Sequence, residues 1–167
     1  MLTPDYYYDS VHEIPYEEFW KEGLRGLIFD IDNTLTAFDQ KLPSEEIVDL
    51  INRLQRMGYK LCLVTNNTNR RLTSFNEHMQ LPGIANALKP LTRGLCQAME
   101  KMSTQPYQTA IIGDQLLSDI WGGRNARITT IMVRPLTERD FLFVRAKRLI
   151  ERLMLRKFFA ERGIKPK

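Results

Sequence analysis

The sequence predicts an α/β fold, with a doubly wound, mostly parallel sheet and helices on both of its faces. From Gly26 onward, short apolar runs alternate with helical patterns, which is typical of parallel β–α–β units. Polar residues that could carry chemistry directly follow several of the apolar runs, at the place where such sheets bind ligands. The length of 167 residues, with 43% hydrophobic and 26% charged residues, fits one soluble domain.

Five strands and four helices are predicted in the body of the chain. The strands are expected at 27–30, 59–65, 84–88, 109–113 and 129–133, and the helices at 44–57, 69–79, 92–102 and 116–124. In the first of these helices, Ile47, Leu50 and Leu54 repeat at helical spacing. Ser44 is a favourable N-cap for that helix, and Gly58 favours its end.

We divide the chain into three parts: an N-terminal arm (1–25), a core domain (26–136) and a basic tail (137–167). The arm is interpreted as irregular, ending in a short helix near residues 19–20. Residues 136–167 hold ten Lys/Arg against four Asp/Glu, so the basicity of the chain belongs to the tail. The spacing predicts one basic amphipathic helix over 137–163. It could pack on the core or on a second subunit, lie against anionic lipid, or bind nucleic acid, the less favoured partner.

The composition of the chain indicates a cytoplasmic protein, or one peripheral to the inner face of the membrane. The chain has no run of 18 apolar residues that could form a transmembrane segment, and no apolar N-terminal signal. Cys62 and Cys96 are the only cysteines, which fits a reducing compartment.

The motif Asp30-Ile31-Asp32-Asn33-Thr34 is the most informative feature of the sequence. Residues i and i+2 of an extended chain point to the same side, so both carboxylates can face one cleft after a buried strand. Two carboxylates so close repel each other unless a cation or a proton intervenes, and Mg²⁺ prefers such oxygen ligands. The alternative is that the pair only caps a helix or decorates a turn.

Three further motifs follow in order. Thr65 and Asn66 come after the second predicted strand, where a hydroxyl and exposed N–H groups suit a phosphate oxygen. Lys89 comes after the third and could place an ammonium against phosphate, with Pro90 expected at the first helical position. Taken singly, the threonine could be a helix cap and the lysine a solvated surface residue. The fourth motif begins Gly113-Asp114-Gln115 and has a further carboxylate at Asp119.

With these four motifs, the sequence resembles the haloacid dehalogenase (HAD) superfamily of phosphatases, which have a Rossmann-like sheet. The resemblance implies that Asp30 is the nucleophile and Asp32 the general acid and then base. It also implies phosphate contacts and Mg²⁺ ligands. The implied phosphate contacts are Thr65, Asn66 and Lys89; the implied metal ligands are Asp30, Asp32 (by its carbonyl) and Asp114; the implied supporting residues are Thr34 and Asp119.

The motifs are also similar to those of the YqeG-type branch, which resembles phosphatidylglycerophosphate phosphatases. The gaps between the motifs hold one helix and one strand each, so the sequence predicts a capless, class III member with an open site. Such a site suits a phosphate carried by something large: a lipid head group, a nucleic-acid end or a phosphoprotein. An anionic lipid phosphate such as phosphatidylglycerophosphate is the expected substrate. The rival interpretations are a non-catalytic receiver-like domain and a scaffold.

Overall fold

The structure, a computed structural model, describes residues 2–137 and contains a six-stranded sheet in which every strand pair is parallel. The order across the sheet is β1-β6-β5-β2-β3-β4. The strands are β1 (Tyr6–Tyr8), β2 (Gly26–Phe29), β3 (Lys60–Val64), β4 (Gly83–Ile84), β5 (Thr109–Gly113) and β6 (Thr129–Val133). The predicted tail helix lies outside the described residues.

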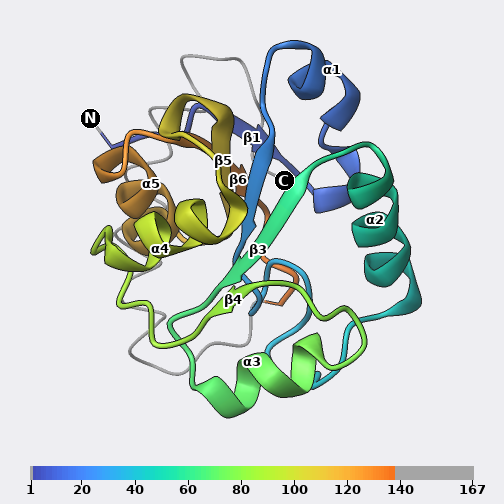
Figure 1. The fold of residues 1–167 in the computed structure, drawn as a ribbon. Helices are drawn as coiled ribbons and strands as arrows, with labels where there is room; N and C mark the ends of the chain where they lie inside the picture. The colour runs from blue at the N-terminus through green and yellow to red at the C-terminus, as the bar shows by residue number, and fades with distance from the viewer. Residues whose placement is uncertain (1, 138–167) are drawn as a thin grey trace.

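Helices cover both faces of the sheet, as predicted (Figure 1). Helices α1 (Tyr16–Lys21) and α2 (Glu45–Arg56) lie on one side, and α4 (Arg93–Met102) and α5 (Trp121–Asn125) lie on the other. Helix α3 (Asn69–Asn76) follows β3. Three shorter elements are the 3₁₀ turns Val11–Glu13 and Pro106–Gln108 and the π-helical segment Leu116–Ile120. The doubly wound fold class is therefore confirmed.

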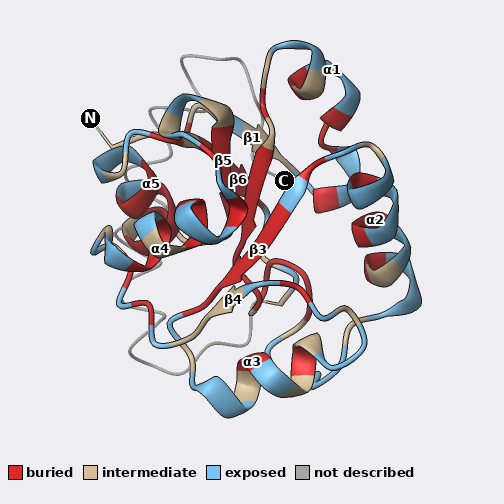
Figure 2. Cartoon of the chain, in the orientation of Figure 1, coloured by how far each residue is buried: buried red, intermediate tan, exposed pale blue. Residues whose placement is uncertain are grey.

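Alternating strand residues build two core layers. Leu27 and Phe29 of β2 pack with the buried side chains of α1 and α2, whereas Ile28 packs with those of α4. All three are fully buried, as the red strands at the centre of Figure 2 illustrate. A parallel sheet buried on both faces explains why the strand sequences are almost continuously apolar. It also makes the strands a rigid base for the residues that follow them.

The N-terminal arm differs from the prediction, because residues 6–8 are not irregular. They form β1, which pairs with β6 in the register Tyr6↔Ile131. Tyrosine favours strands, and Asp5 secures the start of this one by accepting hydrogen bonds from the N–H and the hydroxyl of Thr130. The short helix predicted near residues 19–20 is present as α1.

The region before α4 also differs from the prediction. The strand expected at 84–88 is only β4, Gly83–Ile84. Asn86 and Leu88 have φ of 48° and 55°, left-handed values that end an extended strand. Pro90 is not at the first turn of α4, which begins at Arg93 after the N-cap Thr92. The short strand leaves residues 85–92 as a loop beside the site.

No cap domain is present among residues 2–137. The connection from β2 to α2 is the segment 30–44, which contains no helix or strand of its own beyond an isolated bridge between Asp32 and Thr36. The connection from β3 to α3 is the short segment 65–68. None of the described helices is long and apolar enough to cross a membrane.

Candidate active site

The predicted site residues gather at the carboxyl edge of the sheet. Asp30 follows β2, Thr65 follows β3, Lys89 lies in the loop after β4, and Asp114 follows β5. The chain reverses its direction of winding between β2 and β5, because β3 and β4 lie on one side of β2 while β5 and β6 lie on the other. Such a reversal leaves a crevice between the loops, and it is the usual ligand site in open α/β sheets.

Lys89 is the centre of the hydrogen-bond network. Its ammonium donates to Asp30 Oδ1 and to the carbonyl oxygen of Val64, both at 2.8 Å. It also pairs with Asp119, at 2.7 Å between Nζ and Oδ1. Two hydrogen bonds and a further ion pair therefore hold the ammonium. Burial alone would lower the pKa of Lys89, but Asp119 and Asp30 raise it by more, so the side chain is charged.

Buried carboxylates outnumber the ammonium in this network. Asp30, Asp114 and Asp119 are 6%, 2% and 0% exposed, and Lys89 is 5% exposed. Burial raises the pKa of Asp30 to about 7 in spite of the neighbouring Lys89, with Asp119 and Asp32 adding to the rise. An excess of buried negative charge is costly unless a cation or a proton balances it. The cluster is therefore built to receive positive charge.

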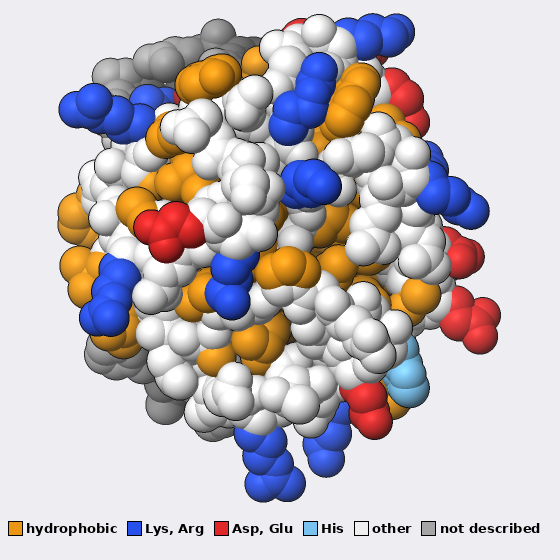
Figure 3. All heavy atoms as spheres, viewed as in Figure 1, with side chains coloured by type: hydrophobic (Ala, Val, Ile, Leu, Met, Phe, Trp, Pro, Cys, Tyr) orange, Lys and Arg blue, Asp and Glu red, His pale blue; other side chains and the backbone are white. Residues whose placement is uncertain are grey.

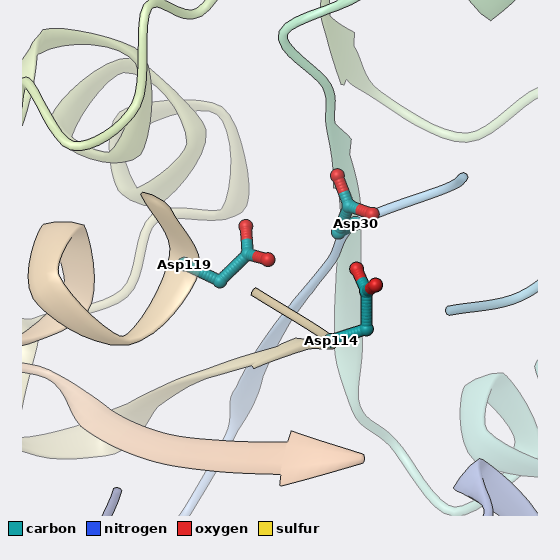
Figure 4. Close-up of side chains that lie close together, drawn as sticks. All are labelled: Asp30, Asp114 and Asp119. Carbon is teal, nitrogen blue, oxygen red and sulfur yellow. The ribbon is translucent and has the colours of Figure 1, made fainter. Parts of the chain in front are cut away.

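The arrangement of oxygens fits a divalent cation. Asp30, Asp114 and Asp119 each offer a carboxylate oxygen, and the three lie within 4.8 Å of one another (Figure 4). Asp30 Oδ2 is buried and has no hydrogen-bond partner in the described part of the chain. Thr34, predicted as supporting, donates to Asp114 Oδ1 at 3.5 Å. Lys89 pairs with one oxygen of Asp30 and one of Asp119, but the second oxygen of Asp119 accepts from Gln115 N–H whereas Asp30 Oδ2 has no hydrogen-bond partner among residues 2–137. Asp30 is therefore better placed than Asp119 to join Asp114 as a carboxylate ligand.

Asp119 is held by the turn on which it lies. The predicted helix over 116–124 begins with the π-helical segment Leu116–Ile120 and continues as α5. Asp119 Oδ2 accepts a hydrogen bond from the N–H of Gln115 at 3.1 Å. A Cβ atom on Gly113 would lie 2.4 Å from Asp119 Cγ, so only glycine allows this close approach. Gly113 thus leaves room for the Asp119 side chain, which is predicted to have a supporting role.

Asp32 faces different partners from Asp30. Its Oδ1 accepts from Arg71 Nε at 2.9 Å and pairs with Arg71 NH2, also at 2.9 Å. Its Oδ2 accepts from the Asn67 side chain at 3.2 Å. Sequence reasoning missed Arg71, which lies on α3 and has no motif signal of its own. Asn67 was within a quoted motif but had no assigned role.

Asn66 and Thr65 are neighbours in sequence, but their side chains bond different backbone groups. The Asn66 side chain accepts from Lys89 N–H at 2.7 Å and donates to the Lys89 carbonyl at 3.0 Å. It holds the backbone of Lys89, so any contact of Asn66 with phosphate would come from its backbone N–H. Thr65 Oγ1 accepts from Asn67 N–H at 3.0 Å. A hydroxyl that accepts this bond can still donate its own hydrogen to a ligand.

A family model described as haloacid dehalogenase-like hydrolase matches residues 37–133. This stretch is more than half of the chain and includes Thr65, Lys89 and Asp114. This chain belongs to the haloacid dehalogenase-like hydrolase family. Asp30 and Asp32 precede the matched stretch, and the structure brings Asp30 into contact with Lys89 within it.

Curated relatives of this HAD hydrolase include two that are named as phosphatases. The probable phosphatase YqeG of Bacillus subtilis is 31% identical over 154 residues, which is 92% of this chain and 90% of the relative. The glyceraldehyde 3-phosphate phosphatase of Pyrococcus abyssi is 24% identical over 128 residues, which is 71% of this chain and 52% of that protein. The predicted HAD-type phosphatase and its resemblance to the YqeG branch are confirmed at this level.

Solved HAD structures share the fold at low sequence identity. A HAD phosphatase from Thermococcus onnurineus superposes with a TM-score of 0.58 at 14% identity, over 71% of this chain and 90% of that one. The HAD hydrolase YfnB from Bacillus subtilis, described as bound to magnesium, gives 0.55 at 18% identity over the same shares of the two chains. At these identities the likeness establishes the fold alone.

Proposed function

We propose that this HAD hydrolase is a Mg²⁺-dependent phosphomonoester hydrolase that works through an aspartyl-phosphate intermediate. The observation that carries the proposal is the buried network of Asp30, Asp114, Asp119 and Lys89. It combines an unpartnered oxygen of Asp30, an excess of carboxylates and a fixed ammonium. A dianionic phosphate monoester can approach an aspartate only where nearby positive charge offsets the repulsion.

In the proposed reaction, a carboxylate oxygen of Asp30 attacks phosphorus while the bond from phosphorus to the ester oxygen breaks. The departing alkoxide takes a proton from Asp32 and leaves as an alcohol. Water then attacks the phosphorus of the aspartyl-phosphate while the bond from phosphorus to the Asp30 oxygen breaks, and Asp32 takes a proton from the water. Inorganic phosphate leaves, Asp30 is again a carboxylate, and Asp32 is again the protonated carboxyl group with which the reaction began.

The other residues act by holding charge and position. Lys89 neutralises Asp30 and the transferring group, and Asp119 keeps its ammonium in place. The Thr65 hydroxyl hydrogen and the Asn66 N–H would donate to phosphate oxygens. The N–H groups of Thr65, Asn67 and Thr68 already donate within the fold. When bound, Mg²⁺ would supply electrophilic stabilisation of the phosphoryl oxygens, and Asp30, Asp114 and the Asp32 carbonyl would hold it.

Metal removal tests the proposal. The protein should release many equivalents of phosphate per chain from p-nitrophenyl phosphate in Mg²⁺, and removal of the ion with EDTA should lower the rate at least ~10²-fold, with recovery when Mg²⁺ is restored. Ca²⁺, which accepts more ligands in looser geometry, should not restore it. A single stable phosphorylation per chain would instead support the receiver-like alternative. Full activity in EDTA would contradict the metal assignment.

We further propose that the phosphate is carried by an anionic lipid, with phosphatidylglycerophosphate as the expected example. The support is an apolar rim at the carboxyl edge of the sheet, formed by exposed side chains in the loops after β2, β4 and β6. These rim residues are 50–65% exposed: Phe38, Leu42, Leu88, Leu91 and Leu136. Because the strands are parallel, these loops lie at the same edge of the sheet as the site. A capless site with an apolar rim suits a head group presented by a bilayer.

Basic side chains accompany the rim. Lys41, Arg93 and Arg134 are exposed in or next to the same loops. On the face seen in Figure 3, hydrophobic side chains reach the surface among lysine and arginine side chains. Each cation near an anionic membrane contributes up to about 1 kcal/mol. The predicted basic tail (137–167) would add to this attraction.

The rim can be tested by the double substitution Leu88→Ser and Leu91→Ser. It should slow hydrolysis of phosphatidylglycerophosphate in anionic vesicles by about tenfold or more, because two large apolar side chains no longer enter the interface. Hydrolysis of p-nitrophenyl phosphate should be unchanged. Tyr107→Ser is the matched control, because Tyr107 is 78% exposed at the opposite end of the sheet, before β5.

The outcomes of this test separate the substrate classes. An equal rate for the double variant and the wild type on vesicles would contradict the rim's role. Faster wild-type hydrolysis of a phosphorylated oligonucleotide or phosphopeptide than of the vesicle-borne lipid would favour those alternative substrates and overturn the lipid proposal. The phosphatase proposal would stand in either case, because it is tested with the soluble ester.

A further inference from the structure

Arg71 of α3 makes an unusual set of contacts for a residue outside the four motifs. Its Nε and NH2 both reach Asp32 Oδ1 at 2.9 Å, across 39 residues of sequence. Its NH1 donates to the carbonyl oxygen of Lys41 at 2.8 Å, in the loop that follows β2. The Phe75 ring lies 5.6 Å from its guanidinium carbon. The side chains of Arg71 and Asp32 are only 12% and 15% exposed, so their pairing is largely shielded from solvent, whereas the bond to Lys41 is exposed.

Each carboxylate oxygen of Asp32 therefore has its own side-chain donor. Arg71 holds Oδ1 and the Asn67 amide holds Oδ2. A planar guanidinium keeps its donors in a rigid arrangement, which a flexible lysine cannot reproduce. The carboxylate plane of Asp32 is therefore defined by two side chains from the segment that begins α3. The same guanidinium ties the β2–α2 loop to this assembly through Lys41.

We infer that Arg71 is a positioning residue for Asp32: it orients the Asp32 carboxyl group, which in its protonated form transfers a proton to the leaving group. The inference rests on the proposed function, in which Asp32 protonates the departing alkoxide. A general acid must lie within hydrogen-bond reach of the atom it protonates, and small displacements cost large factors in rate. Arg71 acts through Asp32, whereas the nucleophile Asp30 is paired with Lys89.

A positioning role has a signature that a general structural role lacks. Proton donation matters most when the leaving group is a strong base, as an alkoxide is, and little when it is a stabilised aryl oxide. Loss of Arg71 should therefore lower kcat/KM for an alkyl phosphate much more than for p-nitrophenyl phosphate. The parameter kcat/KM reports the steps through formation of the aspartyl-phosphate, in which Asp32 acts as the acid.

The first experiment measures kcat/KM of Arg71→Ala on ethyl phosphate and on p-nitrophenyl phosphate in Mg²⁺. The expected loss is ~10²-fold for the alkyl ester and less than about fivefold for the aryl ester. Arg70→Ala is the matched control, because Arg70 precedes Arg71 on α3, carries the same charge and is exposed; it should leave both values unchanged. Arg71→Lys should recover only part of the alkyl activity. Equal losses on the two esters would overturn the inference.

The second experiment is a double-mutant cycle with Asp32→Ala. If Arg71 acts through Asp32, adding Arg71→Ala to Asp32→Ala should lower kcat/KM no further. A further loss of tenfold or more would show that Arg71 binds the substrate directly, and would overturn the positioning role. Should Arg71→Ala fail to fold, Asn67→Ala provides the same test from the other oxygen of Asp32. If the wild type hydrolyses neither ester, the proposed function itself fails. If the wild type is active but the Arg71 variants lose equal activity on the alkyl and the aryl ester, only the role of Arg71 is rejected.

Discussion

Replacing Asp30 by Asn is expected to lower phosphate release by at least about 10³-fold, because a carboxamide cannot form the aspartyl-phosphate. The substitution keeps the size of the side chain, so the fold should persist. It also removes one negative charge from a buried cluster that has too many. In the absence of divalent ions, the thermal unfolding midpoint of Asp30→Asn should therefore equal or exceed that of the wild type.

The measurements are phosphate release from p-nitrophenyl phosphate and thermal unfolding followed by circular dichroism. Asp39→Asn serves as the control, because Asp39 is an exposed aspartate of the same β2–α2 segment. It should alter neither quantity. Wild-type turnover in Asp30→Asn would show that Asp30 is not the nucleophile, whereas a large fall in unfolding temperature would show that its charge stabilises the fold.

Replacing Lys89 by Met should have the largest effect on stability, with a loss of about 3–5 kcal/mol in the free energy of unfolding. The ammonium bonds Asp30, Asp119 and the Val64 carbonyl, and methionine would leave these acceptors buried without their donor. Activity should also fall at least ~10²-fold, because positive charge beside the nucleophile is lost. Urea unfolding without divalent ions measures the first effect, and phosphate release the second.

Two further variants make this prediction specific. Lys101→Met removes the same charge from an exposed position on α4, and its unfolding free energy should change by less than about 0.5 kcal/mol. Adding Asp119→Asn to Lys89→Met should recover part of the lost stability, since one unpaired buried carboxylate disappears. A loss of under about 1 kcal/mol for Lys89→Met, or no recovery in the double variant, would contradict the charge network described here.

Much of the fold could be predicted from local patterns. Strands such as β2 and β5 are continuous apolar runs, and α2 has its N-cap at Ser44, whose hydroxyl accepts from Ile47 N–H. These signals depend on neighbouring residues and need no knowledge of the rest of the chain. Errors arose where local signals are weak: β1 depends on its pairing with β6, and the loop 85–92 is turned by left-handed residues with no glycine to mark them.

The candidate site shows the same division. Sequence motifs placed Asp30, Thr65, Lys89 and Asp114 after successive strands, and the parallel sheet then brings them to one edge. The motifs could not show what each side chain touches. Asn66, expected at phosphate, has its side chain bonded to the backbone of Lys89.

The sequence by itself determined the α/β class, the strand ends that carry the chemistry and the resemblance to HAD phosphatases, because β–α alternation and strand-end motifs are local. Only the tertiary structure decided that β5 lies beside β2, that Lys89 joins Asp30 to Asp119, and that Arg71 holds Asp32. These contacts link residues far apart in the chain, such as the 59 positions between Asp30 and Lys89. Their geometry depends on the strand order, which brings loops from distant parts of the chain to one crevice. No short stretch of sequence encodes that order.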